Sequence, residues 1–504
     1  MIDIRTGDCL TTLDDVPDHS VDSLVADPPA GIAFMGRGWD GNHGHRDRWI
    51  AFWCARFERA RQKAKPGAHA MIWALPRTEH WTATAIENAG WEIRDSMHHV
   101  FGQGWNKDGG QLRPAHEVWI IARAPLSERT IAANIERWGV GELFTDACRV
   151  PRGGEQIAAH HGTARALWGG GTDAYKPGDA GKITRTDGSL PTNQVFSHTE
   201  RCEECGVRKV RGDRRDGGTG ARPGGFGNVG AESGTSEPVG RLYGAEDGTE
   251  TVPAFECLAV CLCGATALHP AGGAPPTCGA CGQRMGWACP VAALDEQSAA
   301  AGMHSAGGKA ERGSMSSAAP IGYGGSMVAE PFRHGDTAGT GSSASRFFHC
   351  FTYLAKASSR ERDLGLDDFF WRIDKRHPFG FVRVSREEFE TLSPAERATG
   401  NVHPTVKPIK LFEHLQRLTT PPGGTTLDIT MGSGTSAIAA DRLGLGYTGR
   451  DTSPEAIEIA RARLRFWQSR SPGATVKTLR TRGAAAPEGQ RSLFAPQASG
   501  GLAK

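Results

Sequence analysis

An acid followed by two prolines stands directly after an apolar run near the start of this chain. Asp27, Pro28 and Pro29 follow residues 21–26, VDSLVA, which have the composition of a buried strand. A carboxylate accepts hydrogen bonds. Proline fixes its own φ and lacks an N–H group, so the carbonyl groups of this segment are held rigidly. Such a segment can accept both hydrogens of an amino group and so orient its lone pair toward an electrophile.

A second segment, residues 427–435, has the pattern of a strand that ends in a glycine turn before a helix. Its sequence LDITMGSGT contains Gly432 and Gly434, which permit a tight turn and close approach of a ligand to the backbone. Asp451 ends the next expected strand, about 20 residues on, where an acid can accept hydrogen bonds from both hydroxyls of a ribose. The alternatives are an ordinary strand-to-helix turn and a helix cap at Asp451 before Pro454.

Eight of the twelve cysteines lie between residues 202 and 289, several of them in close pairs. In a cytosolic chain this spacing favours zinc over disulfides. One expected group has nearly the spacing of a zinc ribbon and consists of Cys261, Cys263, Cys278 and Cys281. The other consists of Cys202, Cys205, Cys257 and Cys289, with His198, His269 and exchanged pairings left open. We expect the metal to stabilise a loop-rich insert rather than to act in catalysis.

The elements that must position these residues fall into two regions with the strand and helix alternation of an α/β domain. In residues 1–150 we expect strands at 21–27, 69–75 and 118–122 and a helix at 49–63. After residue 401 we expect helices at 409–418, from about 433 and from 454, and strands at 425–428 and 446–449, in βαβ order. Gly, Arg and Ser predominate between the two regions, which predicts loops and flexible linkers, and the tail 471–504 is expected to be disordered.

Charge and hydropathy restrict the partners and the cellular location expected for the protein. A formal net charge of +2 over 504 residues creates no overall field for nucleic acid, so any such binding needs a local patch. The candidates are the segment 351–362 and the arginines at 201, 208, 211, 214, 215 and 222, with a solvated linker as the alternative. The N-terminus reads as a strand rather than a signal peptide, and no apolar run approaches the roughly 20 residues that span a bilayer. We therefore expect a cytoplasmic protein without a membrane partner.

Together these segments resemble the DNA amino-methyltransferases that use S-adenosylmethionine. The resemblance rests on the early Asp-Pro-Pro, on HPTVKP at 403–408, on the motif from Asp428 to Thr435, and on Asp451. The order of motifs, catalytic first and cofactor last with target-recognising sequence between, is similar to the beta class. This resemblance implies a Rossmann-like α/β fold with a cysteine-rich insert. Residues 1–150 would be its catalytic half, 151–345 the target-recognition and zinc-ribbon-like insert, and 346–470 its cofactor-binding half.

The resemblance also implies roles for individual residues. Asp8 would help to hold the adenine of S-adenosylmethionine, Asp428 its amino group and Asp451 its ribose. The other implied cofactor-binding residues are Thr405, Lys407, Gly432, Gly434 and Thr435.

Two departures from the family pattern bear on activity. Ala30 stands where the family carries a tyrosine that clamps the flipped base. Methyltransferase-like proteins common in bacteriophages resemble this chain at DPPAGIAFMGRGWD, and in such a group the tyrosine is either dispensable or the chemistry has changed. Substitute stacking residues are Phe34, Trp39 and Trp105, with plain core or loop packing as the alternative for each. Ile429 and Thr430 replace the family's proline and phenylalanine after Asp428.

The sequence therefore favours a site-specific methyltransferase of double-stranded DNA, with Asp27 polarising the target amine. Adenine-N6 is preferred over cytosine-N4, because aspartate rather than serine opens the catalytic motif. A catalytically silent DNA-binding or decoy protein is the rival hypothesis. Ala30, Ile429 and Thr430 favour the rival, whereas the retained acids and glycines oppose it. Methylation of RNA or of a small molecule fits the long insert less well, and the sequence leaves the oligomeric state and any restriction partner open.

Overall fold

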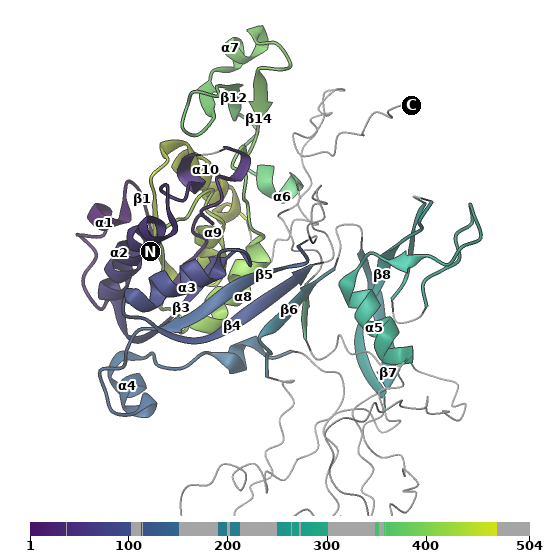
Figure 1. The fold of residues 1–504 in the computed structure, drawn as a ribbon, viewed down its shortest axis with the longest axis horizontal. Coiled ribbons are helices and arrows are strands. Elements are labelled where there is room, and N and C mark those ends of the chain that lie inside the picture. The colour runs from purple at the N-terminus through teal and green to yellow at the C-terminus, as the bar shows by residue number, and fades with distance from the viewer. Residues whose placement is uncertain are drawn as a thin grey trace, which may run out of the picture.

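The computed structural model describes residues 1–36, 38–101, 112, 114–150, 190–198, 202–211, 249–263, 265–271, 274–300, 348–351, 357 and 359–470. These residues form three sheets, of which the largest has nine strands (Figure 1). Within the described ranges, no helix combines the length and apolarity that crossing a membrane requires.

The large sheet combines strands from both ends of the chain. Its order is β1 (Ile2–Thr6), β16 (Gly446–Asp451), β15 (Thr425–Asp428), β2 (Val21–Ala26), β3 (Ala64–Ala74), β5 (His116–Arg123), β4 (Glu92–Phe101), β6 (Gln194–Ser197) and β11 (His349–Phe351). The first five strands are mutually parallel, β5 runs antiparallel to both of its neighbours, and β4, β6 and β11 are parallel to one another. The expected Rossmann-like α/β fold is confirmed.

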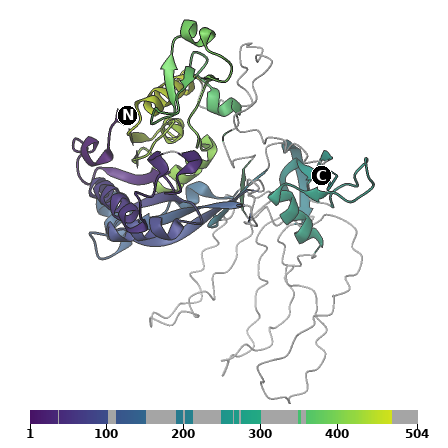
Figure 2. The ribbon, with the colours of Figure 1, turned by 45° about the horizontal axis from the view of Figure 1, so that its top comes forward.

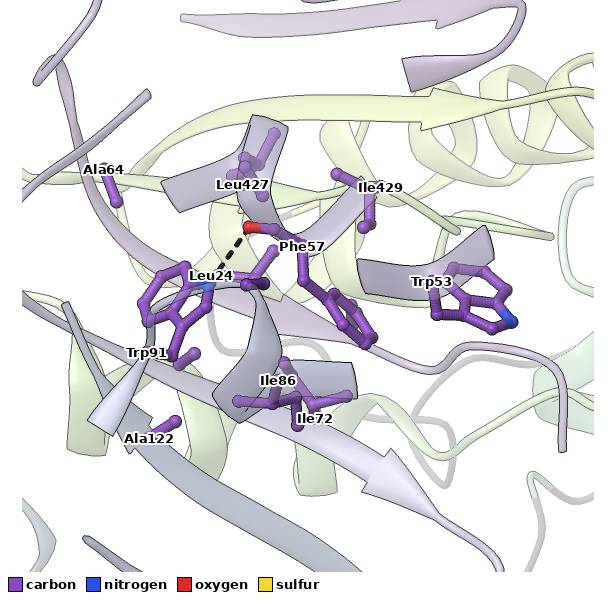
Figure 3. Close-up of a cluster of buried hydrophobic side chains, with 14 of the residues drawn as sticks. Leu24, Trp53, Phe57, Ala64, Ile72, Ile86, Trp91, Ala122, Leu427 and Ile429 are labelled. Carbon is purple, nitrogen blue, oxygen red and sulfur yellow. Dashed lines mark hydrogen bonds between the residues drawn. The ribbon is translucent and has the colours of Figure 1, made fainter. Parts of the chain in front are cut away.

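Helices pack on both faces of this sheet, which buries both faces of central strands such as β2. The helices are α1 (Cys9–Thr12), α2 (Arg46–Lys63), α3 (Glu79–Asn88), α4 (Ile131–Trp138), α8 (Ile409–Thr419), α9 (Thr435–Arg442) and α10 (Pro454–Gln468). Alternate residues of a strand enter opposite cores: Ile72 packs on the side of α2 and α3, and Met71 on the side of α8. Figure 3 shows the first core, where Phe57 lies near Leu24 and Ile429 and its carbonyl accepts a 2.9 Å hydrogen bond from Trp91 Nε1.

The centre of the sheet joins two segments that are far apart in the chain. β2 pairs with β3 on one side and with β15 on the other. Asp22 Oδ2 accepts a 2.7 Å hydrogen bond from the Thr425 amide, across 403 residues of sequence. Residues 1–150 and 346–470 therefore contribute to one sheet.

Two smaller sheets extend from this body. The first contains β7 (Glu203–Arg211), β8 (Thr249–Val260), β9 (Thr266–Pro270) and β10 (Gly286–Trp287), with helix α5 (Pro290–Ala300). Its teal strands lie beyond the end of the large sheet that contains β6 and β11, in both views (Figure 1 and Figure 2). The second contains β12 (Phe370–Ile373), β13 (Phe381–Val384) and β14 (Arg397–Thr399), accompanied by α6 (Ser359–Asp363) and α7 (Arg386–Thr391). The sequence predicted neither sheet, because their strands are short or stand in glycine-rich and polar surroundings.

Candidate functional site

Four carboxylates follow the carboxyl ends of four neighbouring parallel strands. Asp8, Asp451, Asp428 and Asp27 come at or just after the ends of β1, β16, β15 and β2, in that order across the sheet. The chain leaves β15 toward β16 and leaves β2 toward β3, so the strand order reverses between β15 and β2. Crevices at such a reversal are the usual ligand sites of open α/β sheets.

The glycine turn connects β15 to α9 as expected. Gly432 and Gly434 have φ values of +49° and +80°, which side chains rarely adopt. A Cβ atom at Gly434 would lie 2.7 Å from Ala460 Cβ, so glycine lets α9 approach α10 closely. The Gly432 amide donates a 2.8 Å hydrogen bond to Asp451 Oδ2, which ties the turn to the end of β16.

The alternative of a helix cap at Asp451 does not fit the geometry. Ser453 caps α10, since its hydroxyl accepts a hydrogen bond from the Ala456 amide. Asp451 instead accepts from the Gly432 and Ser453 amides, one to each carboxylate oxygen. Asp8 has a capping role of its own: it accepts from the Leu10 amide at the start of α1 and forms an ion pair with Arg56.

Asp428 is buried at the end of β15. Its oxygens accept hydrogen bonds from the Thr430 amide at 2.9 Å and from Ser436 Oγ at 2.5 Å. Burial raises the pKa of Asp428 to about 7, although these hydrogen bonds oppose the shift. Because a buried carboxylate is costly without a counter-charge, this position suits a cationic group of a ligand.

A small cavity of about 40 Å³ opens beside the glycine turn. It is lined by Asp27, His403, Thr405, Lys407, Phe412, Asp428, Thr430, Met431, Gly432, Ser433, Thr435 and Ser436. Thr430 Oγ1 is buried there without a hydrogen-bond partner among the residues that the structure describes. Burial lowers the pKa of His403 to about 4, so its imidazole is neutral at physiological pH. The lining therefore offers polar atoms and two carboxylates against one lysine, which fits a cationic ligand with hydrogen-bonding groups.

Asp27 faces this cavity from the other side of the strand reversal. Its side chain is 17% exposed, and its Oδ1 lies 3.4 Å from Lys407 Nζ. Burial raises the pKa of Asp27 to about 6, against the opposing effect of Lys407. Its carboxylate is thus accessible from the cavity and ionised near neutral pH.

The loop after Asp27 is braced by residues that the sequence did not single out. The Ala30 carbonyl accepts a 2.9 Å hydrogen bond from Thr78 Oγ1. Buried Asp40 accepts hydrogen bonds from the amides of Gly31 and Phe34. Asp40 lies in a glycine-rich loop, and the spacing of residues does not reveal that this loop folds back onto Gly31 and Phe34. The carbonyls of Pro28 and Pro29 are consequently presented on a fixed loop.

A larger cavity of about 470 Å³ lies against the same loop and is lined by Gly31, Ile32, Ala33, Gly41, Asn42, Arg77, Thr78 and Trp81. Phe34 and Trp39, two of the expected stacking residues, belong to this loop and are 37% and 39% exposed. Their faces are thus accessible rather than packed in a core. Trp105, like Arg201, Arg214, Arg215 and Arg222, lies outside the described residues.

Two of the expected cofactor-binding residues differ in their surroundings. Both Thr405 and Lys407 line the small cavity, but Lys407 also bridges Asp27 and Glu117. Of the two departures after Asp428, Ile429 is buried in the core beside α2, and Thr430 lines the small cavity. Ile429 and Thr430 are thus accommodated without disrupting the sheet.

Cysteine and histidine side chains gather in two groups within the described part of the insert. The ligand atoms of each group lie within 4.8 Å of one another. In the first group, Cys261 Sγ is 3.4 Å from Cys281 Sγ, and Cys263 Sγ is 3.7 Å from Cys278 Sγ. Zn–S bonds of about 2.3 Å in a tetrahedron place sulfurs about 3.8 Å apart, whereas a disulfide needs about 2.05 Å. The first group matches the expected zinc-ribbon set.

The second group differs from the expected set at one position. It consists of His198, Cys202, Cys257 and Cys289, all buried. His198 Nδ1 lies 3.3 Å from Cys257 Sγ and 3.4 Å from Cys289 Sγ, and its ring stacks on Phe255. Cys205 is exposed and belongs to neither group. β7 begins directly after Cys202 and carries Cys205 away, while β6 delivers His198 to the cluster.

Comparison with known proteins agrees with this geometry. Residues 331–462, which contain β15, the glycine turn and Asp451, match the model of a protein family described as DNA methylase. This segment, called the methylase segment below, is similar to that family. Within the methylase segment lie Thr405, Lys407 and Asp428, while Asp27 comes from outside it.

One curated relative is the Type II methyltransferase M2.DpnII of Streptococcus pneumoniae. It is 44% identical over 62 residues, which are 12% of this chain and 23% of that relative. This chain therefore spans about a quarter of the relative's length.

Two solved methyltransferase structures are more distant. The M1.HpyAVI–SAM complex has 11% identity and a TM-score of 0.32, covering 92% of this chain and all of that one. The PvuII cytosine-N4-specific DNA methyltransferase has 8% identity and a TM-score of 0.38, covering 94% and 89%. At TM-scores below 0.5, the fold assignment rests on the strand order of this chain.

Proposed function

We propose that this chain transfers a methyl group from S-adenosylmethionine to an exocyclic base amine of double-stranded DNA, with adenine-N6 preferred over cytosine-N4. The observation that carries the proposal is the pair Asp27 and Asp428 on opposite sides of the strand reversal, joined to a methylase segment. The chemical preference for adenine follows from aspartate at the first position of the catalytic motif.

The cofactor would bind between the glycine turn and the carboxylates of Asp428 and Asp451. S-adenosylmethionine supplies a methyl group on a sulfonium cation. The acidic lining of the small cavity favours a cation. Glycine at position 432 leaves room for the ligand, because a Cβ atom there would lie only 3.0 Å from His403 Nε2. Thr430 Oγ1 offers a further hydrogen-bonding group.

Asp27 and the proline segment would act on the substrate. An exocyclic amine donates its lone pair to the ring, which makes it a weak nucleophile. Asp27 accepts a hydrogen bond from one amine hydrogen, and a carbonyl of Pro28 or Pro29 accepts the other, which directs the lone pair toward the methyl group. The target base must leave the duplex, and the exposed faces of Phe34 and Trp39 can stack on it. Positioning by fixed groups then supplies most of the rate.

The two cysteine-containing groups would hold structural zinc. Their donor sets, four cysteines in one group and three cysteines with one histidine in the other, are those of closed structural sites. The metal would hold together the strands of a sheet whose own clusters of buried hydrophobic side chains are small. Neither group borders the small cavity.

A methyl-transfer assay with its product identified tests this function. The full chain is incubated with tritiated-methyl S-adenosylmethionine and duplex DNA of mixed sequence, and the nucleosides are separated after digestion. Label in N6-methyladenine is the expected result. Label in N4-methylcytosine would correct the base, and absence of label with cofactor binding intact would favour the silent DNA-binding protein.

A further inference from the structure

A buried row of polar side chains begins with Asp27 and Lys407 at the small cavity and continues away from it through Glu117. Lys407 Nζ lies 3.4 Å from Asp27 Oδ1 and donates a 3.0 Å hydrogen bond to Glu117 Oε2. The side chains of Lys407 and Glu117 are only 12% and 10% exposed. The lysine is therefore held between two carboxylates with little access to water.

Glu117 is itself fixed from two further strands. Its Oε2 accepts a 2.8 Å hydrogen bond from Trp73 Nε1, and its Oε1 lies 2.9 Å from His99 Nδ1. His99 Nε2 lies 2.7 Å from Ser197 Oγ at the end of β6. The Trp73 ring also faces Lys407, with Nζ 4.1 Å from the ring centroid. The side chains of Lys407, Glu117 and His99 are thus each held by polar partners on neighbouring elements.

The charges around Asp27 determine how readily its carboxyl group ionises. Besides burial, the carboxylates of Glu117 and Asp40 raise the pKa of Asp27, and Lys407 lowers it. Asp27 in turn raises the pKa of Asp428. Burial alone would lower the pKa of Lys407, but Asp27 and Glu117 raise it. Burial would likewise raise the pKa of Glu117, but Lys407 and His99 lower it. The row therefore holds a fixed cation beside the acid that would accept the amine hydrogen.

We propose that Lys407 is a positioning residue that orients the Asp27 carboxylate toward the target amine, and that Glu117 anchors Lys407 through Trp73 and His99. The inference rests on the proposed function and assigns Lys407 to the catalytic acid rather than to the cofactor. It predicts that the charges of Lys407 and Glu117 act on Asp27 with opposite sign.

The test is the pH dependence of kcat for methyl transfer at saturating cofactor, measured on the full chain. In Lys407→Met, the acid limb of the profile is expected to move up by about one pH unit or more, because an adjacent cation no longer favours the carboxylate. In Glu117→Gln, which keeps nearly the same shape, the limb is expected to move down by roughly half a unit. Lys407→Arg keeps the positive charge and should leave the acid limb close to its position in the unmodified protein. Cofactor affinity, measured by calorimetry, should change by less than about threefold.

A matched control is Lys63→Met, which removes another buried lysine that forms an ion pair with a carboxylate, that of Asp18. This variant should leave the acid limb in place. If Lys407→Met loses activity without moving the limb, or loses cofactor affinity in parallel, the inference is overturned and Lys407 belongs to the cofactor site. Absence of transfer by the unmodified chain would instead overturn the proposed function.

Discussion

At the scale of the residue, the site keeps two carboxylates where water is scarce. Burial raises the pKa values of Asp27 and Asp428 to about 6 and about 7. In the unfolded chain both would titrate near 4. The folded state therefore binds protons more tightly than the unfolded state, so its stability contribution from these groups is lost as pH rises through 6 and 7. A cationic ligand offsets this cost.

Asp27 provides the simplest test at this scale. Asp27→Ala removes an acceptor for the amine, and methyl transfer should fall by at least about 100-fold. Cofactor binding should remain, because Asp428, Asp451 and the glycine turn are unchanged. Transfer and calorimetric binding are measured on the same preparation, and retained transfer would contradict the role given to Asp27.

Asp428 should make cofactor binding depend on pH. Since a cation prefers the ionised carboxylate, affinity should fall by about fivefold between pH 7 and pH 6. In Asp428→Asn this step should disappear and binding should be weak throughout. The ligand-free variant should also melt at a higher temperature than the unmodified protein at pH 8, because it buries no charge there. Calorimetry and thermal unfolding measure the two effects, and an unchanged pH step in the variant would exclude Asp428 as its source.

Sequence reasoning found the residues whose neighbours along the chain define them. Asp27 after its strand and Gly432 and Gly434 after theirs are local patterns. His99 and Glu117 come together only because β4 and β5 pair in a register that places them opposite each other. The single acid in the apolar run HEVWIIAR was the available signal for Glu117. No spacing rule connects it to a lysine 290 residues away.

At the scale of the element, glycine sets the distance between two helices. Gly434→Ala would place a Cβ against Ala460 at a positive φ, which should destabilise the protein by about 3 kcal/mol. Gly444→Ala is the control, since Gly444 also has positive φ but a Cβ there meets nothing within 4 Å, and about 1 kcal/mol is expected. Denaturant unfolding gives both values, and equal losses would contradict close α9–α10 packing as the reason for Gly434.

Strand positions were predicted well where apolar runs are long, as at β2, β3 and β5. The start of β3 was missed because Lys65, Pro66 and Gly67 break its pattern, although the strand runs from Ala64. His198 could not be preferred over Cys205 from spacing, because the choice depends on which residue the neighbouring strand delivers. Pairing geometry, not local composition, decides such cases.

At the scale of the whole molecule, the insert and the large sheet should respond separately to metal. Purified protein is expected to hold two zinc ions per chain, one in each group. His198→Ala and Cys257→Ser should each remove one ion, whereas Cys205→Ser should remove none. Metal content by mass spectrometry distinguishes these variants, and loss of zinc from Cys205→Ser would restore the assignment made from sequence.

Chelation extends this prediction to the whole chain. Removing zinc should expose the β7–β10 sheet to proteases while S-adenosylmethionine still binds, because the small cavity is lined from other elements. Limited proteolysis and calorimetry measure the two responses. Loss of both together would show that the insert and the cofactor site are one cooperative unit.

The central position of β2 has a consequence for biosynthesis. β15 is made about 400 residues after its partner β2, since the Asp22–Thr425 hydrogen bond spans 403 residues of sequence. Until then, one edge of a strand that is fully buried in the folded protein lacks its partner and is prone to aggregation. The crevice between Asp27 and Asp428 also cannot form before that moment. A nascent chain therefore acquires its proposed cofactor site only after β15 has been made, and the period before that is the one in which a chaperone would matter most.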